Sequence, residues 1–457
     1  MAVTAPPSTS APGGPTAPGG AAGPGAPAGQ PPAEPPRPPH TWQVLTRATR
    51  AWFEGTPGRL RVAGIATVLA CLLFGVFAFV AASTRAGALA DARADATQLV
   101  RVQTIHTNLV SADANLTNAF LVGGLEPPAA RTAYQDGIAT AAKTLADASG
   151  NNTSDAATLA EVNDVVTQYT GLVESARANN RLGYPLGAAY LREATNLLRS
   201  DALPQLETLG RSVQDRIDHA YSASADAAAW LVAGLLVALV VLIVAQVWLA
   251  GRTRRLFNLP LVAATAIVLV VGIVLAGVMW WAQDKAKNTR SDAYFSTLAL
   301  TTARADAFDA KSSESLTLIA RGQGQPYEQR FQNEADNAQA ILARASGGGN
   351  DDIAAAAKAF QDYRTVHKQI RAKDDAGDWD AAVALATGSG PDTANAAFQK
   401  FNDASGQALQ HTSTQLRRDL DDAHGPLPVF AWIALVAGIA AAVAAGWGIS
   451  VRMREYR

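Results

Sequence analysis

The sequence predicts an all-α integral membrane protein with four transmembrane helices, and three observations support this. Apolar residues make up 49% of the 457 residues and charged ones only 17%, which is too apolar for an ordinary soluble protein of this length. No alternating pattern typical of β-strands is present. Four apolar runs lack Asp, Glu, Lys, Arg and His and are long enough to cross a bilayer. They cover residues 62–82, 230–249, 261–281 and 429–449.

Short arginine-rich segments lie on one side of the predicted spans, and basic segments next to spans remain in the cytoplasm. We therefore expect a multi-pass protein of the plasma membrane, embedded in the lipid bilayer, with both termini in the cytoplasm. The basic segments are an amphipathic juxtamembrane stretch at 41–61, a loop at 250–260 and a tail at 450–457. Within the loop, Arg252, Arg254 and Arg255 are candidate contacts for a cytoplasmic partner. The alternative is that these three arginines only set the topology.

Residues 1–40 consist mostly of Pro, Gly, Ala, Ser and Thr. Such a segment cannot bury enough apolar surface to offset the entropy lost on folding, so we expect a disordered cytoplasmic tail. The alternatives are a solvated tail without a role and a flexible arm that docks a cytoplasmic partner.

Two long segments, residues 83–229 (module 1) and 282–428 (module 2), separate the spans and are expected to be extracytoplasmic. The two modules share matched sequence positions at identical spacing, which predicts an internal duplication. The matched structural positions in module 1 are Tyr169, Arg177 and Gly183, and those in module 2 are Tyr363, Arg371 and Gly377.

Each module is predicted to be an antiparallel four-helix bundle. Apolar residues recur at steps of three and four, which is typical of a helical seam. Glycine and proline clusters divide the helices, and Pro204 predicts a further break in module 1 before its last helix. The stretch from Gly425 to Pro428 predicts a break before the fourth span. The first helix of each module is expected to continue from the span that precedes it.

The fourth span has small residues at every fourth position, and such a row lets two helices pack closely. We expect this face to contact another span or a second copy of the chain in a homodimer; alanine-rich composition alone is the alternative. The four residues are Ala434, Gly438, Ala442 and Gly446.

No catalytic, metal-binding or cofactor-binding motif is recognisable, so we expect neither an enzyme nor a cofactor. The histidines are scattered without ligand spacing, and we interpret them, His367 included, as surface or partly buried residues. Cys71 has no partner cysteine and is interpreted as lipid-facing. A net charge of −1 gives no indication of nucleic-acid binding.

The stretch from Tyr363 through Arg371 and Gly377 to Ala382 resembles the turn before the last helix in the four-helix-bundle ligand-binding domains of bacterial chemoreceptors and sensor kinases. Residues 177–189 resemble it less closely. Such receptors normally continue into a cytoplasmic signalling domain, whereas this sequence ends at Arg457, seven residues after Ser450. The resemblance implies that signalling requires a separate cytoplasmic protein.

The layout of a proline-rich tail followed twice by span, bundle and span is similar to that of the GlnX family of actinobacterial membrane sensors. This resemblance implies a solute-binding lipoprotein as an extracytoplasmic partner that senses aspartate or glutamate. It also implies a soluble Ser/Thr kinase as the cytoplasmic partner.

We therefore predict a transmembrane sensor or signal-relay protein that passes an extracytoplasmic signal, such as an amino-acid nutrient, to a cytoplasmic partner. Two alternatives stay open: a structural scaffold of a cell-envelope complex, and a receptor that binds a small molecule directly. For direct binding, Arg101, His106 and Asp113 are conceivable contacts, although a solvated face explains them as well.

Overall fold

The computed structural model describes residues 56–122, 126–182, 184–253, 258–289 and 293–454, and within these residues it contains helices and no strand. The all-α prediction is therefore confirmed. The predicted tail 1–40 and most of the juxtamembrane segment 41–61 lie outside the described residues. Gly183, Arg254 and Arg255 also lie outside them, and Arg252 lies in a helix without a described side chain.

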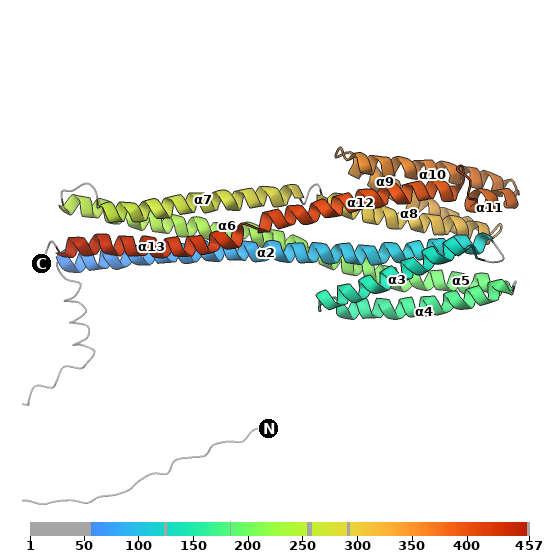
Figure 1. The fold of residues 1–457 in the computed structure, drawn as a ribbon, viewed down its shortest axis with the longest axis horizontal. Helices are drawn as coiled ribbons and strands as arrows, with labels where there is room; N and C mark the ends of the chain where they lie inside the picture. The colour runs from blue at the N-terminus through green and yellow to red at the C-terminus, as the bar shows by residue number, and fades with distance from the viewer. Residues whose placement is uncertain (1–55, 123–125, 183, 254–257, 290–292, 455–457) are drawn as a thin grey trace, which may run out of the picture. The chain divides into compact units, whose positions relative to one another are not determined.

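Four helices are long and apolar enough to cross a membrane, as predicted. They are α2 (Thr56–Val122), α6 (Leu203–Thr253), α7 (Leu259–Thr289) and α13 (Leu427–Arg454). Their apolar segments pack into one core (Figure 1), while large side chains such as Val240, Ile273 and Val443 remain exposed on the outer faces. Exposed apolar faces of this kind are suited to contact with lipid.

The helices α2 and α13 approach each other most closely at two glycines. A Cβ atom on Gly438 would lie 2.5 Å from the Cα atom of Gly75, so only glycine permits this crossing. Ala434 and Ala442 are also buried there, whereas Gly446 is half-buried. Cys71 is fully buried, and its carbonyl oxygen lies at the same crossing. The interpretation of Cys71 as lipid-facing was wrong because the close approach of α13 covers it.

In module 1, the part of α2 beyond its predicted span forms a bundle with α3 (Pro128–Asn151), α4 (Ala156–Arg181) and α5 (Leu186–Leu197), and α6 continues into the second predicted span. A π-helical turn, η1 (Leu198–Ala202), joins α5 to α6 without interruption. The predicted break at Pro204 was therefore wrong. The wider π turn accommodates a proline that lacks an N–H group, so the helix continues.

Module 2 contains α8 (Phe295–Ile319), α9 (Gln325–Ser346), α10 (Asp351–Asp375), α11 (Trp379–Thr387) and α12 (Ala394–His424). The helix α12 ends at His424 and α13 begins at Leu427, so the predicted break near Pro426 is confirmed. Buried residues of both modules belong to one apolar core.

Candidate functional site

The first helices of the two modules, α2 and α8, pack against each other, and polar side chains are buried along this contact. The hydroxyl group of Ser312 on α8 donates a hydrogen bond to the Asp113 carboxylate on α2 at 2.9 Å. Further along α2, the Asn118 amide donates to the Asn395 side-chain oxygen at 3.1 Å. These bonds connect the two modules directly.

Asp113 is the centre of the polar cluster in module 1, with only 1% of its surface exposed. Its carboxylate accepts hydrogen bonds from Thr195 at 2.7 Å and from the Tyr169 hydroxyl at 3.4 Å, in addition to Ser312. Three hydroxyl donors compensate for part of the cost of burying this side chain. Asp113 therefore joins α4, α5 and α8 to α2.

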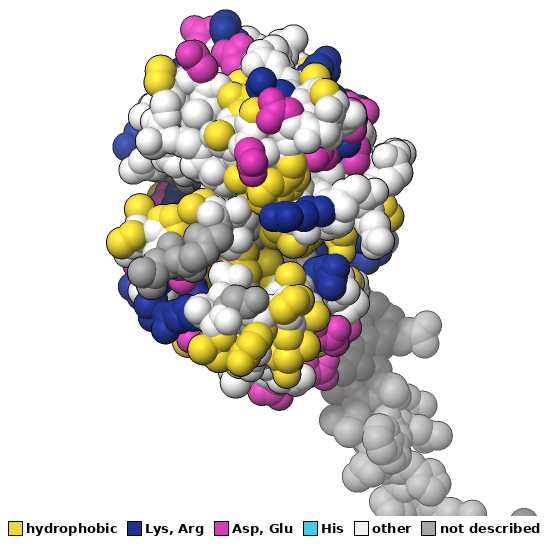
Figure 2. Space-filling model, turned by 90° about the vertical axis from the view of Figure 1, so that its right-hand side faces the viewer, with side chains coloured by type: hydrophobic (Ala, Val, Ile, Leu, Met, Phe, Trp, Pro, Cys, Tyr) yellow, Lys and Arg dark blue, Asp and Glu magenta, His cyan; other side chains and the backbone are white. Residues whose placement is uncertain are grey.

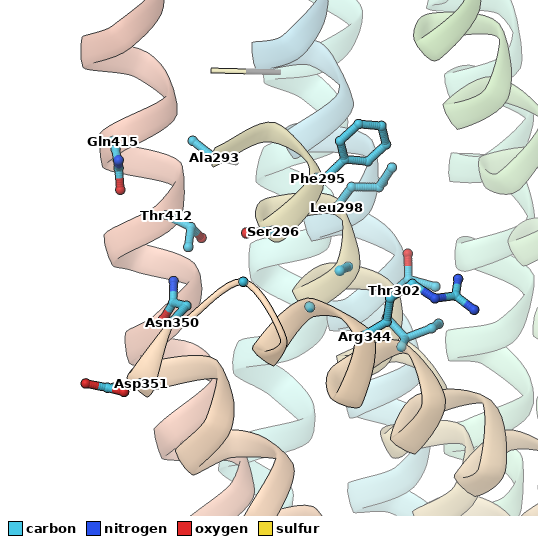
Figure 3. A pocket seen from close by; sticks show the side chains of 15 residues that line it. Ala293, Phe295, Ser296, Leu298, Thr302, Arg344, Asn350, Asp351, Thr412 and Gln415 are labelled. Atoms are coloured by element: carbon cyan, nitrogen blue, oxygen red, sulfur yellow. The ribbon is translucent and has the colours of Figure 1, made fainter. Parts of the chain in front are cut away.

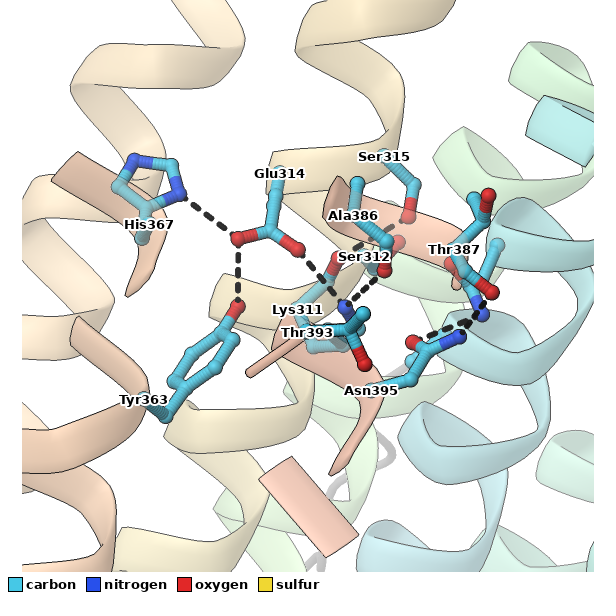
Figure 4. Close-up of polar contacts among 12 residues, drawn as sticks. Lys311, Ser312, Glu314, Ser315, Tyr363, His367, Ala386, Thr387, Thr393 and Asn395 are labelled. Atoms are coloured by element: carbon cyan, nitrogen blue, oxygen red, sulfur yellow. Dashed lines mark hydrogen bonds and ion pairs between the residues drawn. The ribbon is translucent and has the colours of Figure 1, made fainter. Parts of the chain in front are cut away.

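Glu314 on α8 occupies the centre of a second, more strongly charged cluster in module 2 (Figure 4). One carboxylate oxygen accepts from the Lys311 ammonium at 2.7 Å, and the other contacts Tyr363 at 3.2 Å and His367 at 2.8 Å. Burial alone raises the pKa of Glu314, but Lys311 and His367 more than offset this and lower it to about 2. The carboxylate is therefore charged at neutral pH.

His367 connects this carboxylate to the surface of module 2. Its ring stacks on Phe331 at 3.4 Å, and its other nitrogen lies 3.2 Å from the Glu328 carboxylate. Burial lowers the pKa of His367, and its bonds to Glu314 and Glu328 raise it by more than burial lowers it. The net effect is a pKa above the ordinary value for histidine. His367 is 1% exposed. Its interpretation as a surface or partly buried residue was wrong because two carboxylates stabilise it in the core.

The tyrosines and arginines at the matched positions have similar surroundings in the two modules. Tyr169 donates to Asp113, as Tyr363 donates to Glu314. Arg177 forms ion pairs with Glu126 and Glu174 and lies 4.4 Å from the centre of the Tyr134 ring.

In module 2, Arg371 forms ion pairs with Glu328, Asp374 and Asp375. Gly377 follows α10 with a φ of +81°, a conformation that favours glycine. The matched arginines thus anchor the end of a helix in each module.

Acidic side chains gather beside the contact between the modules. The Arg199 guanidinium of η1 lies 2.9 Å from the Asp309 carboxylate of α8. Burial, together with neighbouring carboxylates, raises the pKa of Asp306 and of Glu334 to about 7. Both carboxyl groups therefore exchange protons near neutral pH.

The residues suggested for direct ligand contact lie on α2, but they are not a solvated face. Asp113 is buried, and both ring nitrogens of His106 are shielded from solvent without a hydrogen-bond partner among the described residues. Arg101 is half-buried and donates weakly to Gln98 at 3.4 Å. The packing of α8 against α2 covers Asp113 and His106, which periodicity within module 1 could not reveal.

A cavity of about 800 Å³ lies in module 2 near its span-proximal end (Figure 3). Apolar side chains such as Leu298 line it together with Ser296, Thr302 and Thr412. Asn350, beside it, caps α10 by accepting hydrogen bonds from the Asp352 and Ile353 amides. The volume is within the usual range for small-molecule sites. Within the described residues, no group of three potential metal-ligating side chains is found.

A family model described as an actinobacterial sensor domain matches residues 88–222, which lie within module 1. No curated protein and no solved structure shows a significant match. The family match supports a sensing role for module 1.

Proposed function

We propose that the chain is a transmembrane sensor that relays an extracytoplasmic signal to a cytoplasmic partner. One observation carries this proposal: the region that matches a sensor domain is bounded by α2 and α6, and both helices continue without interruption into predicted spans. A continuous helix can transmit displacements on the order of 1–2 Å along its length.

Such a relay requires that module 1 and module 2 respond together. The hydrogen bond from Ser312 to Asp113 and the ion pair between Arg199 and Asp309 connect them. A shift of α8 against α2 would therefore act on α2, which is continuous with the first predicted span. On the cytoplasmic side, the loop containing Arg252, Arg254 and Arg255 offers a basic surface for the partner.

The partners are proposed from the resemblance of the layout to GlnX-type sensors. The extracytoplasmic partner is a solute-binding lipoprotein loaded with an amino acid, and the cytoplasmic partner is a Ser/Thr kinase. No catalytic chemistry by the chain itself is required, and a homodimer is compatible with this arrangement.

The proposal is tested by crosslinking the full-length protein in its native membrane, purifying it and identifying the attached proteins by mass spectrometry. We expect a solute-binding lipoprotein and a cytoplasmic kinase. A variant lacking residues 1–40 serves as a control. If this variant still recovers the kinase, the basic loop contacts the kinase; if it does not, the tail is the contact. Recovery of envelope-assembly proteins alone would contradict the relay and support a scaffold.

A second candidate function is direct binding of a small molecule, which the cavity of about 800 Å³ in module 2 favours. Thr302→Leu would fill part of this cavity. If a metabolite raises the thermal unfolding midpoint of the full-length protein and Thr302→Leu abolishes the shift, direct binding is supported. An equal shift in both proteins would contradict binding in this cavity.

A further inference from the structure

The turn between α4 and α5 exposes an unusual set of apolar side chains. Leu182 is 67% exposed, Tyr184 57% and Leu186 52%; we refer to these three residues as the tip patch. Elsewhere in the described parts of the two modules, only Val122 and Phe295 are large apolar residues with comparable exposure. Figure 2 looks onto the end of the molecule where this turn lies, and hydrophobic side chains gather there.

The matched turn in module 2 shows that the fold does not need an apolar surface at this place. At the spacing that aligns Tyr169 with Tyr363, Leu182 corresponds to Ala376, Tyr184 to Asp378 and Leu186 to Asp380. These module 2 side chains are exposed and hydrophilic or small. Module 1 therefore exposes large apolar side chains that the matched turn of module 2 lacks. Exposed apolar groups that the fold does not require indicate a binding surface.

Hydrogen bonds and close packing position the residues on either side of the tip patch. The amides of Leu182 and Tyr184 both donate to the Asn179 carbonyl oxygen, at 3.2 and 3.0 Å. A Cβ atom on Gly187 would lie 2.9 Å from the Asn180 nitrogen, so the start of α5 packs tightly on the end of α4. A preformed surface loses little conformational entropy when a partner binds.

The position of the tip patch restricts what can cover it. From Ala82, at the end of the first predicted span, α2 extends 40 residues to Val122 at the same end as the patch, about 60 Å at 1.5 Å per residue. The bilayer that holds the spans cannot reach this far. Copies in the same membrane are parallel, so their tips point in the same direction and do not face each other.

The charge beside the patch restricts the partner further. Arg181 is exposed, and within the described residues no carboxylate forms an ion pair with it. The matched residue in module 2 is acidic Asp375, which pairs with Arg371. Tyrosine and arginine beside exposed apolar groups are typical of protein interfaces, and an unpaired arginine favours carboxylates on the other side.

We propose that the tip patch docks a separate folded extracytoplasmic protein whose contact surface is apolar at its centre and acidic at its rim. The inference deepens the proposed function, because it names the surface through which the extracytoplasmic partner is received. Module 2 does not share this role, since its matched turn is acidic and lacks the apolar residues.

The test places a photoreactive benzophenone side chain at position 184 of the full-length protein in its native membrane, with position 378 as the matched control. We expect a discrete adduct with an extracytoplasmic protein at position 184 and none at position 378. The attached protein is then purified and its binding to the full-length chain in lipid nanodiscs is measured.

The combined variant Arg181→Asp, Leu182→Ala, Tyr184→Asp and Leu186→Asp introduces the module 2 residues. We expect it to weaken binding at least about tenfold, and added salt to weaken wild-type binding. If the combined variant fails to fold, Tyr184→Ser alone, with an unchanged circular dichroism spectrum, gives the same test.

Three outcomes would overturn the docking proposal: adducts only with a second copy of this chain, no adduct at position 184, or unchanged affinity in the variants. A partner that crosslinks at position 378 but not at 184 would contradict docking at the tip patch and leave the relay intact. If the adduct at position 184 forms but no cytoplasmic kinase is crosslinked to the protein, only the relay is contradicted.

Discussion

Module 1 and module 2 differ in how their buried polar groups are stabilised. In module 1, the Asp113 carboxylate accepts hydrogen bonds from neutral hydroxyl groups. In module 2, Glu314 lies between Lys311 and His367, so opposite charges are buried together. Hydrogen bonds from hydroxyl groups can rearrange at a small cost in free energy. Removing one member of a buried charge cluster, in contrast, leaves another buried charge without compensation.

The two modules also differ in their connection to the membrane. Module 1 continues through α2 and α6 into the spans, whereas module 2 is separated from α13 by the break after His424. In the proposed relay, this difference assigns transmission to module 1 and leaves module 2 to support α2 from the side.

The largest expected effect comes from Glu314→Gln. Lys311 and His367 would lose their shared carboxylate in the core, which should lower the free energy of opening of α8 and α10 by about 3 kcal/mol or more. Asp113→Asn, at the carboxylate that Tyr169 contacts in module 1, should cost only about 1 kcal/mol, because an amide oxygen can still accept from the hydroxyl groups. Hydrogen exchange of the full-length protein measures both. Equal costs would contradict the difference between the two modules.

The attachment of α13 to α2 can be broken at a single glycine. In Gly438→Ala, the new methyl group would meet the backbone of Gly75 at 2.5 Å, so the helices must separate, at a cost of about 1–3 kcal/mol. Gly446→Ala is the matched control, because its methyl group would meet only a side-chain atom of Val68 at 3.4 Å. Thermal unfolding in nanodiscs should show a lower midpoint for Gly438→Ala alone.

The dependence of stability on pH should be steeper in module 2. His367 has a raised pKa, so its contribution is complete below its ordinary pKa and is lost as the pH rises through the raised value. Asp306 and Glu334, with pKa values raised to about 7, retain protons that the unfolded chain releases at lower pH. The carboxyl contribution falls as the pH rises from about 4 to about 7, and the His367 contribution falls as the pH rises above about 6.5, so both reduce the stability of module 2 with rising pH.

The combined variant Asp306→Asn and Glu334→Gln removes the carboxyl part of this dependence. At pH 8 we expect it to be more stable than wild type by on the order of 2 kcal/mol. Near pH 4 the two proteins should be much more similar, because these carboxyl groups are then largely protonated in the unfolded as well as in the folded wild-type chain. Hydrogen exchange of α8 and α9 at the two pH values provides the comparison, and a parallel dependence in variant and wild type would contradict this explanation.

Much of the fold could be predicted from sequence, because spans and helical breaks depend on local composition. The charge-free runs predicted four spanning helices, and Gly425 with Pro426 predicted the break before α13. Pro204 was misleading because local rules do not reveal that a π turn can carry the helix past a proline.

The polar clusters were much harder to predict, since they depend on contacts between distant segments. Asp113 and Ser312 are 199 residues apart in sequence, and Glu314 and His367 are 53 apart. One signal was available for the second cluster: Lys311 and Glu314 are three residues apart on an otherwise small and apolar helix face. His367, one helical turn after the matched Tyr363, completes that signal.

The most direct test of transmission through module 1 measures amide hydrogen exchange where the two modules meet the predicted spans, in the full-length protein in nanodiscs. Residues 84–96 of α2 lie within one uninterrupted helix, so we predict slow exchange there. The amides of Leu427 and Val429 lie in the first turn of α13, where backbone N–H groups lack helical acceptors, so we predict much faster exchange. Equal exchange at both connections, or rapid exchange in residues 84–96, would contradict transmission through module 1.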